Sequence, residues 1–306
     1  MAQNAPILLF CYKRLACLRN TVEALKNCAL ASESELYIFS DGAKAEKDQP
    51  QIDAVRAFIG SITGFGKITL RESKKNKGLA SSIIQGVTEV INIAERVIVL
   101  EDDLVVSPNF LVYMNEGLYH YKANPKVYSI SGYTIQMRAP ETYPYDVYFL
   151  PRASSWGWAT WKDRWENIDW SVSDFAEFSQ NRQKIKEFNK GGSDMFAMLK
   201  KQMSGEIDSW AIRWCYHQFK VQTLTAFPVI SKVQNEGFTS EATNTHVYNR
   251  YRTVLDKGNL LSFRFLDNVE MDPLFLEQFQ RFYSVYTRAV SKIKTYIKKA
   301  RHKTNG

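Results

Sequence analysis

The 306-residue sequence lacks the features that mark a disulfide-rich or membrane-spanning protein. No stretch reaches the roughly 18 apolar residues that a spanning helix needs, and the run APILLFCY near the start is too short for a signal peptide and leads into two cations. We therefore expect a cytoplasmic protein without a cleaved signal. Neither a disulfide framework nor a structural zinc site is indicated, because no CxxC pair or zinc-finger spacing occurs among Cys11, Cys17, Cys28 and Cys215.

Acidic residues are missing from the end of the chain. From Arg281 onward there are eight Lys or Arg and no Asp or Glu, which leaves 32 cations (40 minus 8) against 32 acids in residues 1–280. The net charge of +8 therefore belongs to the tail, and the neutral body gives no reason to expect a nucleic-acid partner.

The tail also has a helical pattern. Apolar residues from Tyr286 to Ala300 fall on one stripe, and Lys and Arg fill the other positions. A basic amphipathic helix of this kind suits an anionic membrane surface, so we expect a peripheral location at the inner face of the membrane. RNA binding and a flexible solubilising tail are the alternatives.

Apolar runs in the first hundred residues alternate with helical patterns. The runs PILLFCY, ELYIFSD, KITLRES and RVIVLED are typical of strands, and amphipathic segments separate them. This order predicts a parallel sheet with helices on both faces. The segment SPNFLVYMNEGLYHY then predicts a helix with Ser107 as N-cap and Pro108 in its first turn.

Polar residues follow three of the predicted strands. Lys13 and Arg14 follow the first, Asp41 follows the second, and three acids in a row, residues 101–103, follow the fourth. Since ligands bind beyond the carboxyl ends of parallel strands, these side chains are expected to converge on one crevice.

The acidic turn has two interpretations. The three acids can be solvated residues before a helix start, where acids are common. Alternatively, one carboxylate binds Mg²⁺ or Mn²⁺ while its neighbours bind ligand hydroxyls, since hard cations prefer oxygen ligands and adjacent carboxylates need a compensating positive charge. One or two protein carboxylates would be enough to hold the cation if phosphate oxygens and water supplied its remaining ligands. This interpretation therefore implies a nucleoside diphosphate as the bound ligand.

The segment VIVLEDDLVVSPNF resembles the acidic motif of GT-A fold glycosyltransferases, and is most similar to the EDD motif of the inverting N-acetylglucosaminyltransferase I type. The resemblance covers roughly residues 7–214. It implies a nucleotide-diphospho-sugar transferase fold and assigns roles by position: metal ligand for Asp103, ribose contact for Asp102, donor-sugar contact for Glu101, nucleotide contact for Arg14 and an acceptor for uracil N3 for Asp41. Asp41 can also be a plain turn residue before a glycine.

The same resemblance extends to later segments. Lys77 and Gly78, at a strand-to-helix junction, are candidates for binding the anionic donor, since helix N-termini favour anions. In the tryptophan-rich segment, Trp158 is expected in a loop beside Gly157 and is a candidate face for the donor sugar. Residues 158, 161 and 165 also have helical spacing, and Trp161 and Trp165 can instead be core residues. In GEIDSWAIRW, Asp208 is the candidate general base beside Trp210, and Glu206 is its rival.

The family has two adjacent acids at the position of Asp208, whereas this chain has Asp208 followed by serine. His246, in a polar run, is a candidate metal ligand or a surface histidine.

These observations predict an α/β protein of the GT-A type, with a mostly parallel central sheet, flanking helices and a C-terminal basic helix. We expect a nucleotide-sugar-binding half at residues 1–132, an acceptor-binding and catalytic half at 133–270 and the basic tail at 271–306. The activity that the resemblance implies is metal-dependent transfer of a hexosyl or N-acetylhexosaminyl group from a nucleotide-sugar, preferably a UDP-sugar, to a glycan or lipid-linked glycan. Inversion is expected from the resemblance alone.

Two alternatives are a non-catalytic glycan-binding domain and a sugar nucleotidyltransferase. The second is disfavoured because the segment CYKRLACLRN after the first strand contains no glycine for a triphosphate cradle.

Overall fold

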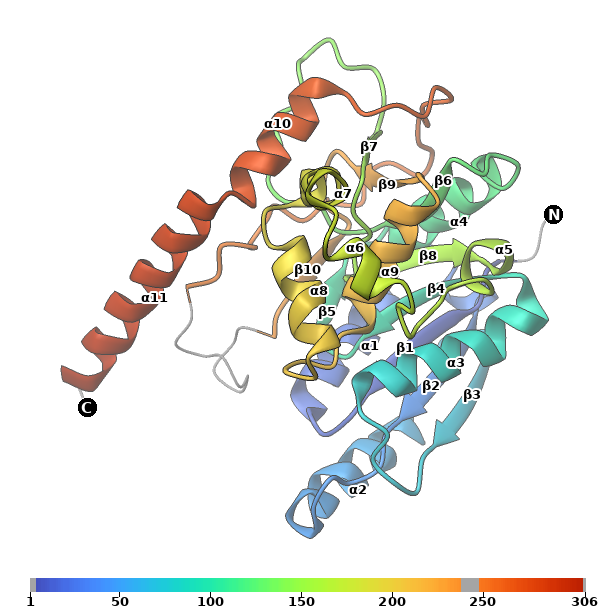
Figure 1. Cartoon of the computed structure of the whole chain (residues 1–306). Coiled ribbons are helices and arrows are strands. Elements are labelled where there is room, and N and C mark those ends of the chain that lie inside the picture. The colour runs from blue at the N-terminus through green and yellow to red at the C-terminus, as the bar shows by residue number, and fades with distance from the viewer. Residues whose placement is uncertain (1–3, 238–247, 305–306) are drawn as a thin grey trace.

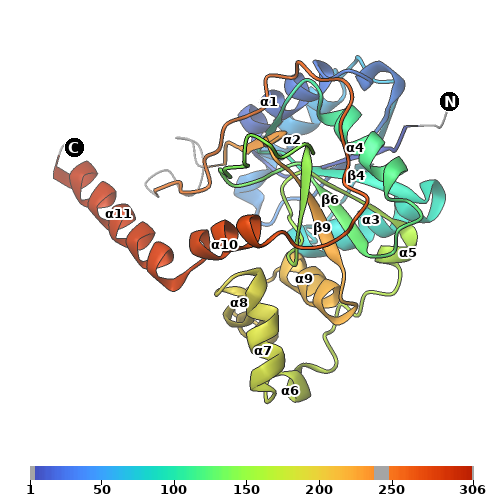
Figure 2. The same ribbon diagram turned by 90° about the horizontal axis from the view of Figure 1, so that it is seen from above.

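The computed structural model describes residues 4–237 and 248–304. Its centre is an eight-stranded sheet with the order β3-β2-β1-β4-β8-β6-β9-β7, covered by helices on both faces (Figures 1 and 2). The predicted α/β class, with a mostly parallel central sheet and flanking helices, is confirmed. Six strands run in one direction, and β8 and β7 run in the other.

The first half of the chain forms the predicted βα units. Four parallel strands alternate with three helices in chain order: β1 (Ile7–Cys11), α1 (Leu15–Lys26), β2 (Glu35–Ser40), α2 (Gln49–Ile59), β3 (Lys67–Glu72), α3 (Leu79–Ala94) and β4 (Arg96–Glu101).

The second half extends the same sheet, so the two predicted halves share one layer of strands. Its elements are α4 (Phe110–His120), β6 (Val127–Ser131), β7 (Val147–Leu150), β8 (Trp158–Trp161), the short helices α5 (Lys162–Trp165), α6 (Phe175–Phe178) and α7 (Arg182–Phe188), then α8 (Met195–Met203), α9 (Trp210–Lys220) and β9 (Leu224–Pro228). A separate two-stranded sheet joins β5 (Leu104–Val106) to β10 (Val233–Asn235).

Side chains of β1 alternate between two hydrophobic cores, as the period of a strand requires. Ile7 and Leu9 pack into the core that contains α1, α2 and α4. Leu8 and Phe10 pack on the opposite face, against α3 and α9. All five residues of β1 are buried, which explains why the strand has no polar position.

Two local predictions are corrected. Ser107 is not the N-cap of the helix that follows the acidic turn, because Val106 ends the unpredicted strand β5 and α4 starts at Phe110 with Asn109 as N-cap. Instead, the Ser107 hydroxyl donates to the Asn109 side chain at 2.7 Å. The stretch around Trp158 is not a loop, because residues 158–161 form strand β8 between β4 and β6.

Two helices end the chain, α10 (Pro273–Phe282) and α11 (Val285–Thr304). In both views α11 extends away from the sheet (Figures 1 and 2). Among residues 4–237 and 248–304, no helix has both the length and the apolar character to cross a membrane.

Candidate functional site

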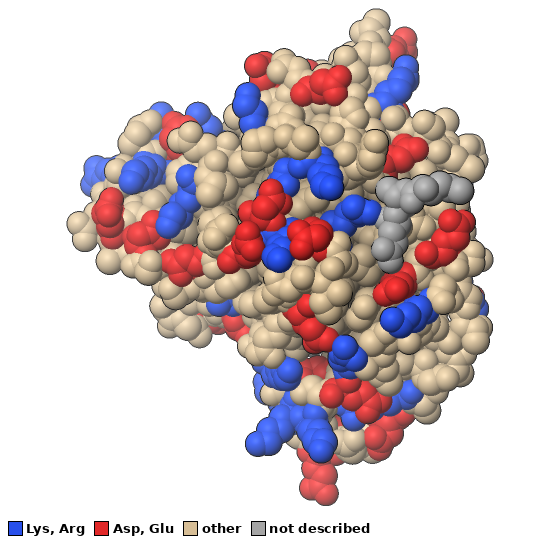
Figure 3. Space-filling model, turned by 90° about the vertical axis from the view of Figure 1, so that its right-hand side faces the viewer, with Lys and Arg blue, Asp and Glu red and all other residues tan. Residues whose placement is uncertain are grey.

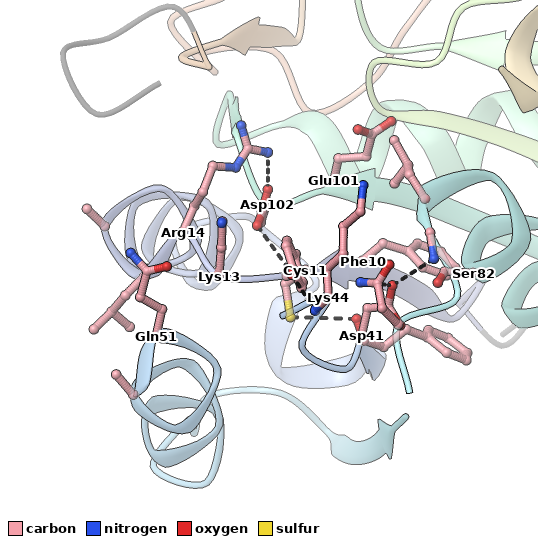
Figure 4. A pocket seen from close by; sticks show the side chains of 18 of the residues that line it. Phe10, Cys11, Lys13, Arg14, Asp41, Lys44, Gln51, Ser82, Glu101 and Asp102 are labelled. Atoms are coloured by element: carbon pink, nitrogen blue, oxygen red, sulfur yellow. Dashed lines mark hydrogen bonds and ion pairs between the residues drawn. The ribbon is translucent and has the colours of Figure 1, made fainter. Parts of the chain in front are cut away.

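A cavity of about 1050 Å³ lies beyond the carboxyl ends of β1, β2 and β4. It is the crevice that the strand order predicts, and side chains from all three strand ends point into it (Figure 4). Its charged and polar lining residues are Lys13, Arg14, Arg19, Asp41, Lys44, Gln51, Asn76, Ser82, Glu101 and Asp102. A cavity that mixes these cations with carboxylates suits a ligand that carries both phosphate and hydroxyl groups.

The Arg14 guanidinium joins the loop after β1 to the acidic turn. It donates to Oδ2 of Asp103 at 2.9 Å and makes a second ion pair with Asp102. Asp102 is 3% exposed, so its carboxylate depends on this partner and on the backbone N–H of Tyr12. The positive charge that the acidic turn requires is therefore supplied, in this structure, by Arg14.

Burial and mutual repulsion alter the acid–base properties of the turn. Burial raises the pKa of Glu101 to about 8, and the charges of Asp103 and Asp102 add to the effect. Burial also raises the pKa of Asp102 to about 6, against the opposing charge of Arg14. Among the described residues, the Glu101 carboxylate has no hydrogen-bond donor, and its side chain extends into the cavity (Figure 4). It is therefore available to a ligand hydroxyl.

Asp41 connects the end of β2 to the loop before α3. Its carboxylate accepts hydrogen bonds from the backbone N–H groups of Gly42, Lys77 and Gly78 and from the Asn76 amide, at 2.8–3.1 Å. These donors occupy most of the four acceptor positions of a carboxylate. Asp41 thus shapes the wall of the cavity, and this bonding leaves little of its capacity for a uracil N–H.

The loop that Asp41 holds requires glycine at its end. Gly78 has φ +77°, a conformation that disfavours side chains, and it precedes α3 directly. Gly78 lines the cavity, whereas the Lys77 side chain turns away to Gln85 at 2.9 Å and borders a separate hollow of about 380 Å³. The structure therefore brings Gly78, but not the Lys77 ammonium, to the cavity.

Asp208 lies beside Gly78, which lines the cavity, although the two are 130 residues apart in the chain. A Cβ built on Gly78 would lie 3.9 Å from Oδ2 of Asp208. Ser209 is the N-cap of α9, which fixes Asp208 just before the helix, and Arg213 donates to its Oδ1 at 3.3 Å. Glu206 instead accepts from Ser204 in its own turn. Of the two candidate acids, Asp208 is therefore the one that the structure shows next to a residue of the cavity wall.

Trp158 and Trp210 do not reach the cavity. Trp158 is 1% exposed and Trp210 is 3% exposed, and their rings pack on each other and on Trp214. Rings that are covered in this way offer no face to a sugar. The core position predicted for Trp165 is confirmed, since it stacks on Trp158 at 5.6 Å.

The acidic turn can offer limited coordination to a divalent cation. Gly237 lies so close to Asp103 that a Cβ there would be 2.3 Å from Oδ2, and Oδ1 has a long contact of 3.4 Å with Asn235. Within residues 4–237 and 248–304, no group of three or more His, Cys, Asp or Glu could hold a metal. The residues present fit a cation that takes one carboxylate oxygen from Asp103 and its other ligands from phosphate and water. His246 lies outside the described residues.

Several residues of the cavity had not been identified from the sequence. Lys44 and Gln51 come from the segment that leads into α2 and from α2 itself, and Arg19 comes from α1. Phe10 and Phe39 stack on each other at 4.7 Å in its floor. Lys44 follows Asp41 by three positions and could have been included with that strand end, but nothing in the sequence distinguishes Arg19 from other helix-surface cations.

No family model and no curated protein matches the chain. Solved structures that resemble it include the mannosyltransferase PcManGT of Pyrobaculum calidifontis in complex with GDP-mannose and Mn²⁺, at 12% identity and a TM-score of 0.39, over 55% of this chain and 48% of that one. S. aureus TarS (residues 1–349) is 7% identical, with a TM-score of 0.38, over 79% of this chain and 68% of that one.

The galactosyltransferase LgtC, in complex with donor and acceptor sugar analogues, is 9% identical, with a TM-score of 0.38, over 72% of both chains. The match thus spans about half the length of PcManGT. Likeness at this level does not assign an activity.

Proposed function

We propose that the protein is a metal-dependent glycosyltransferase that moves a sugar from a nucleotide-sugar, preferably a UDP-sugar, to a hydroxyl of a glycan or lipid-linked glycan. The cavity beyond β1, β2 and β4 carries this proposal, because the acidic turn and the Arg14 guanidinium meet there at one sheet edge, and the Asp208 carboxylate lies beside Gly78 in its wall. The EDD resemblance supports it independently.

The cavity suits each part of such a donor. Arg14, with Lys13 and Lys44 nearby in the lining, provides positive charge for the diphosphate. In this proposal Asp102 accepts from a ribose hydroxyl, and Glu101, whose side chain extends into the cavity, binds a hydroxyl of the donor sugar. Asp41 contributes by holding the wall of the nucleotide site.

Mg²⁺ or Mn²⁺, when bound with Asp103 as a ligand, would supply positive charge that stabilises the departing diphosphate. Asp103 already shares its Oδ2 with Arg14. We therefore propose that Arg14 turns toward the diphosphate when the donor binds, which leaves the Asp103 carboxylate for the cation.

Asp208 is the proposed general base. Its carboxylate takes the proton of the acceptor hydroxyl while that oxygen attacks the anomeric carbon. The bond from this carbon to the diphosphate oxygen breaks, and the diphosphate leaves with the electron pair. Because the acceptor attacks from the face opposite the diphosphate, the configuration inverts. Asp208 has the solvent access that an acceptor needs, since 64% of its side chain is exposed.

A thermal-shift titration with UDP, with and without Mn²⁺, tests this function. A ligand at about 100 times its dissociation constant adds roughly 2.7 kcal/mol of stability, which corresponds to several degrees in Tm. UDP should stabilise the wild type more with Mn²⁺ than without it, and Asp103→Asn should remove the metal-dependent part. Asp267→Asn, which changes an acid with a 93% exposed side chain, is the matched control and should behave as wild type.

Donor transfer is then measured with a screen of UDP-sugars, where Asp208→Asn should abolish turnover without reducing the UDP shift. If UDP binds but neither sugar transfer nor donor hydrolysis occurs with any donor, the transferase proposal fails. If no nucleotide changes Tm in either condition, the transferase proposal also fails, and glycan binding without turnover is the alternative to test.

A further inference from the structure

The C-terminal helix α11 exposes an apolar stripe. Five large side chains stand out from the described part of the helix, with exposed fractions of 45% to 78%: Val285, Tyr286, Ile293, Tyr296 and Ile297. With about 100° per residue, they fall within an arc of about 120° on one side. An apolar stripe of this width normally faces the core of a protein. Here it faces away.

The opposite side of α11 is polar and faces the rest of the chain. Thr295 accepts a hydrogen bond from the backbone N–H of Tyr248 at 3.1 Å, and it lies on the same side as Thr287 and Ser291. The hydroxyls of Ser291 and Thr295 also donate to carbonyls one turn earlier, at 2.8 and 2.9 Å. The helix is therefore attached through its hydroxyl side, which fixes the apolar stripe outward.

Cations border the stripe. By helical position, Lys292 lies on one flank and Lys294 on the other, and both are exposed. The Lys294 ammonium also lies 4.8 Å from the centre of the Tyr248 ring. From Arg281 to the end of the sequence there are eight Lys or Arg and no acid. The face of the body shown in Figure 3 differs from this, since basic and acidic side chains are interspersed on it. Positive charge and exposed apolar area thus coincide on one projecting helix.

We propose that α11 binds the surface of an anionic lipid bilayer, with its apolar stripe in the interface and its lysines at the headgroups. Tyrosine suits this position because its ring is apolar and its hydroxyl is polar. A protein partner would need acidic and apolar groups in one matching groove, whereas an anionic bilayer presents both over any area. The inference is independent of the proposed transferase activity.

Vesicle sedimentation with the full chain tests it. The wild type should bind vesicles of phosphatidylcholine mixed with phosphatidylglycerol, should bind pure phosphatidylcholine weakly, and should lose affinity as salt is raised. The double substitution Ile293→Ser with Ile297→Ser should lower the partition coefficient about tenfold or more, because two side chains no longer enter the interface. Lys292→Gln with Lys294→Gln should lower it by a similar factor on the anionic vesicles alone.

The matched control is Ile93→Ser, which removes an equally apolar side chain that is 74% exposed on α3. It should bind as the wild type does. The Tm of all variants should stay close to that of the wild type, since the changed side chains are exposed. Analytical ultracentrifugation on the same samples shows whether a second copy of the chain covers the stripe instead.

Absence of binding to anionic vesicles would overturn the proposal, as would an equal loss in Ile93→Ser. It would also be overturned by a wild-type dimer that the Ile293→Ser with Ile297→Ser variant dissociates, if that dimer does not bind vesicles. Binding of the chain to RNA but not to anionic vesicles would also overturn the proposal.

Discussion

Arg14, in the loop after β1, donates a hydrogen bond of 2.9 Å to Asp103, in the turn after β4. The two strands are neighbours in the sheet, so their carboxyl ends emerge side by side. Through this contact the chain neutralises its acidic turn without any ligand. A diphosphate that enters the cavity offers Arg14 another anionic partner. Binding of such a ligand would therefore change the charge balance of the acidic turn.

Substitution of Arg14 by Ala should weaken UDP binding by about 10- to 100-fold, since hydrogen bonds to a charged group contribute roughly 1.5–3 kcal/mol. It should also lower the unfolding free energy, because Asp102 loses its cation in a buried position. Arg14→Lys keeps the positive charge but not the planar set of guanidinium donors. Its UDP affinity and its unfolding free energy should therefore lie between those of the wild type and those of Arg14→Ala.

Isothermal titration with UDP gives the affinity, and urea unfolding gives the stability. Arg281→Ala, which removes a cation with a 79% exposed side chain, serves as control and should change neither. An unchanged UDP affinity in Arg14→Ala would show that Arg14 has a structural role alone.

Asp41→Asn should reduce the affinity for UDP, ADP and GDP by similar factors. The substitution replaces an acceptor of the backbone N–H groups of Lys77 and Gly78, so the loop before α3 loosens for every nucleotide. A direct hydrogen bond to uracil would instead give a loss confined to UDP. Parallel titrations with the three nucleotides measure the difference, and a loss confined to UDP would restore Asp41 as a base-contacting residue.

The first half of the fold could be predicted from local patterns. The strands β1, β2 and β4 have apolar runs and the helices between the first four strands have clear periodicity, so their order predicts a parallel sheet and the edge where its polar ends meet. Arg14, Asp41 and Glu101 were found in this way, because each lies at the end of a strand or within three residues of it.

Contacts between distant segments could not be predicted from the sequence. The residues around Trp158 have the composition of a sugar-binding loop. Strand pairing with β4 and β6 nevertheless buries Trp158. Arg19 reaches the cavity because of how α1 packs, and its neighbours in sequence contain no sign of this. Such features depend on tertiary packing, which overrides local propensity.

The stability of the metal-free, nucleotide-free protein should fall as pH rises from about 4.5 to 8. The pKa of Glu101 is raised to about 8 by burial and by its acidic neighbours, so the folded protein holds a proton there more tightly than the unfolded chain does. A raised carboxyl pKa gives stability that is complete below the unfolded value and is lost as pH passes through the folded one. Asp102, with a pKa of about 6, adds to the same trend.

Glu101→Gln should remove most of this slope and raise the unfolding free energy at pH 8 by on the order of 2 kcal/mol. Urea unfolding in EDTA at several pH values provides the measurement. Glu177→Gln, at a position with an 81% exposed side chain, is the control and should keep the wild-type slope. Identical pH profiles for Glu101→Gln and the wild type would mean that Glu101 has an ordinary pKa in the folded protein.

A buried ion pair holds the segment after residue 248 against the body. Lys232 is 3% exposed and pairs with Asp256, and its ammonium also lies 4.7 Å from the centre of the Phe263 ring. Burial lowers the pKa of Lys232, so the charged form depends on Asp256. Breaking such a pair from one side leaves an uncompensated buried charge.

Asp256→Asn should therefore lower the unfolding free energy by about 3 kcal/mol at pH 7, and by less as pH rises, because a lysine with a depressed pKa gains folded stability with increasing pH. Adding Lys232→Met to Asp256→Asn should recover much of the loss, since no buried charge remains. Glu277→Gln breaks the exposed pair with Arg281 and should cost less than about 0.5 kcal/mol. Urea midpoints of the three variants separate the two contributions. If the double variant is no more stable than Asp256→Asn, the loss comes from the weaker hydrogen bond that the Gly258 N–H donates once an amide replaces the Asp256 carboxylate, rather than from the unpaired lysine.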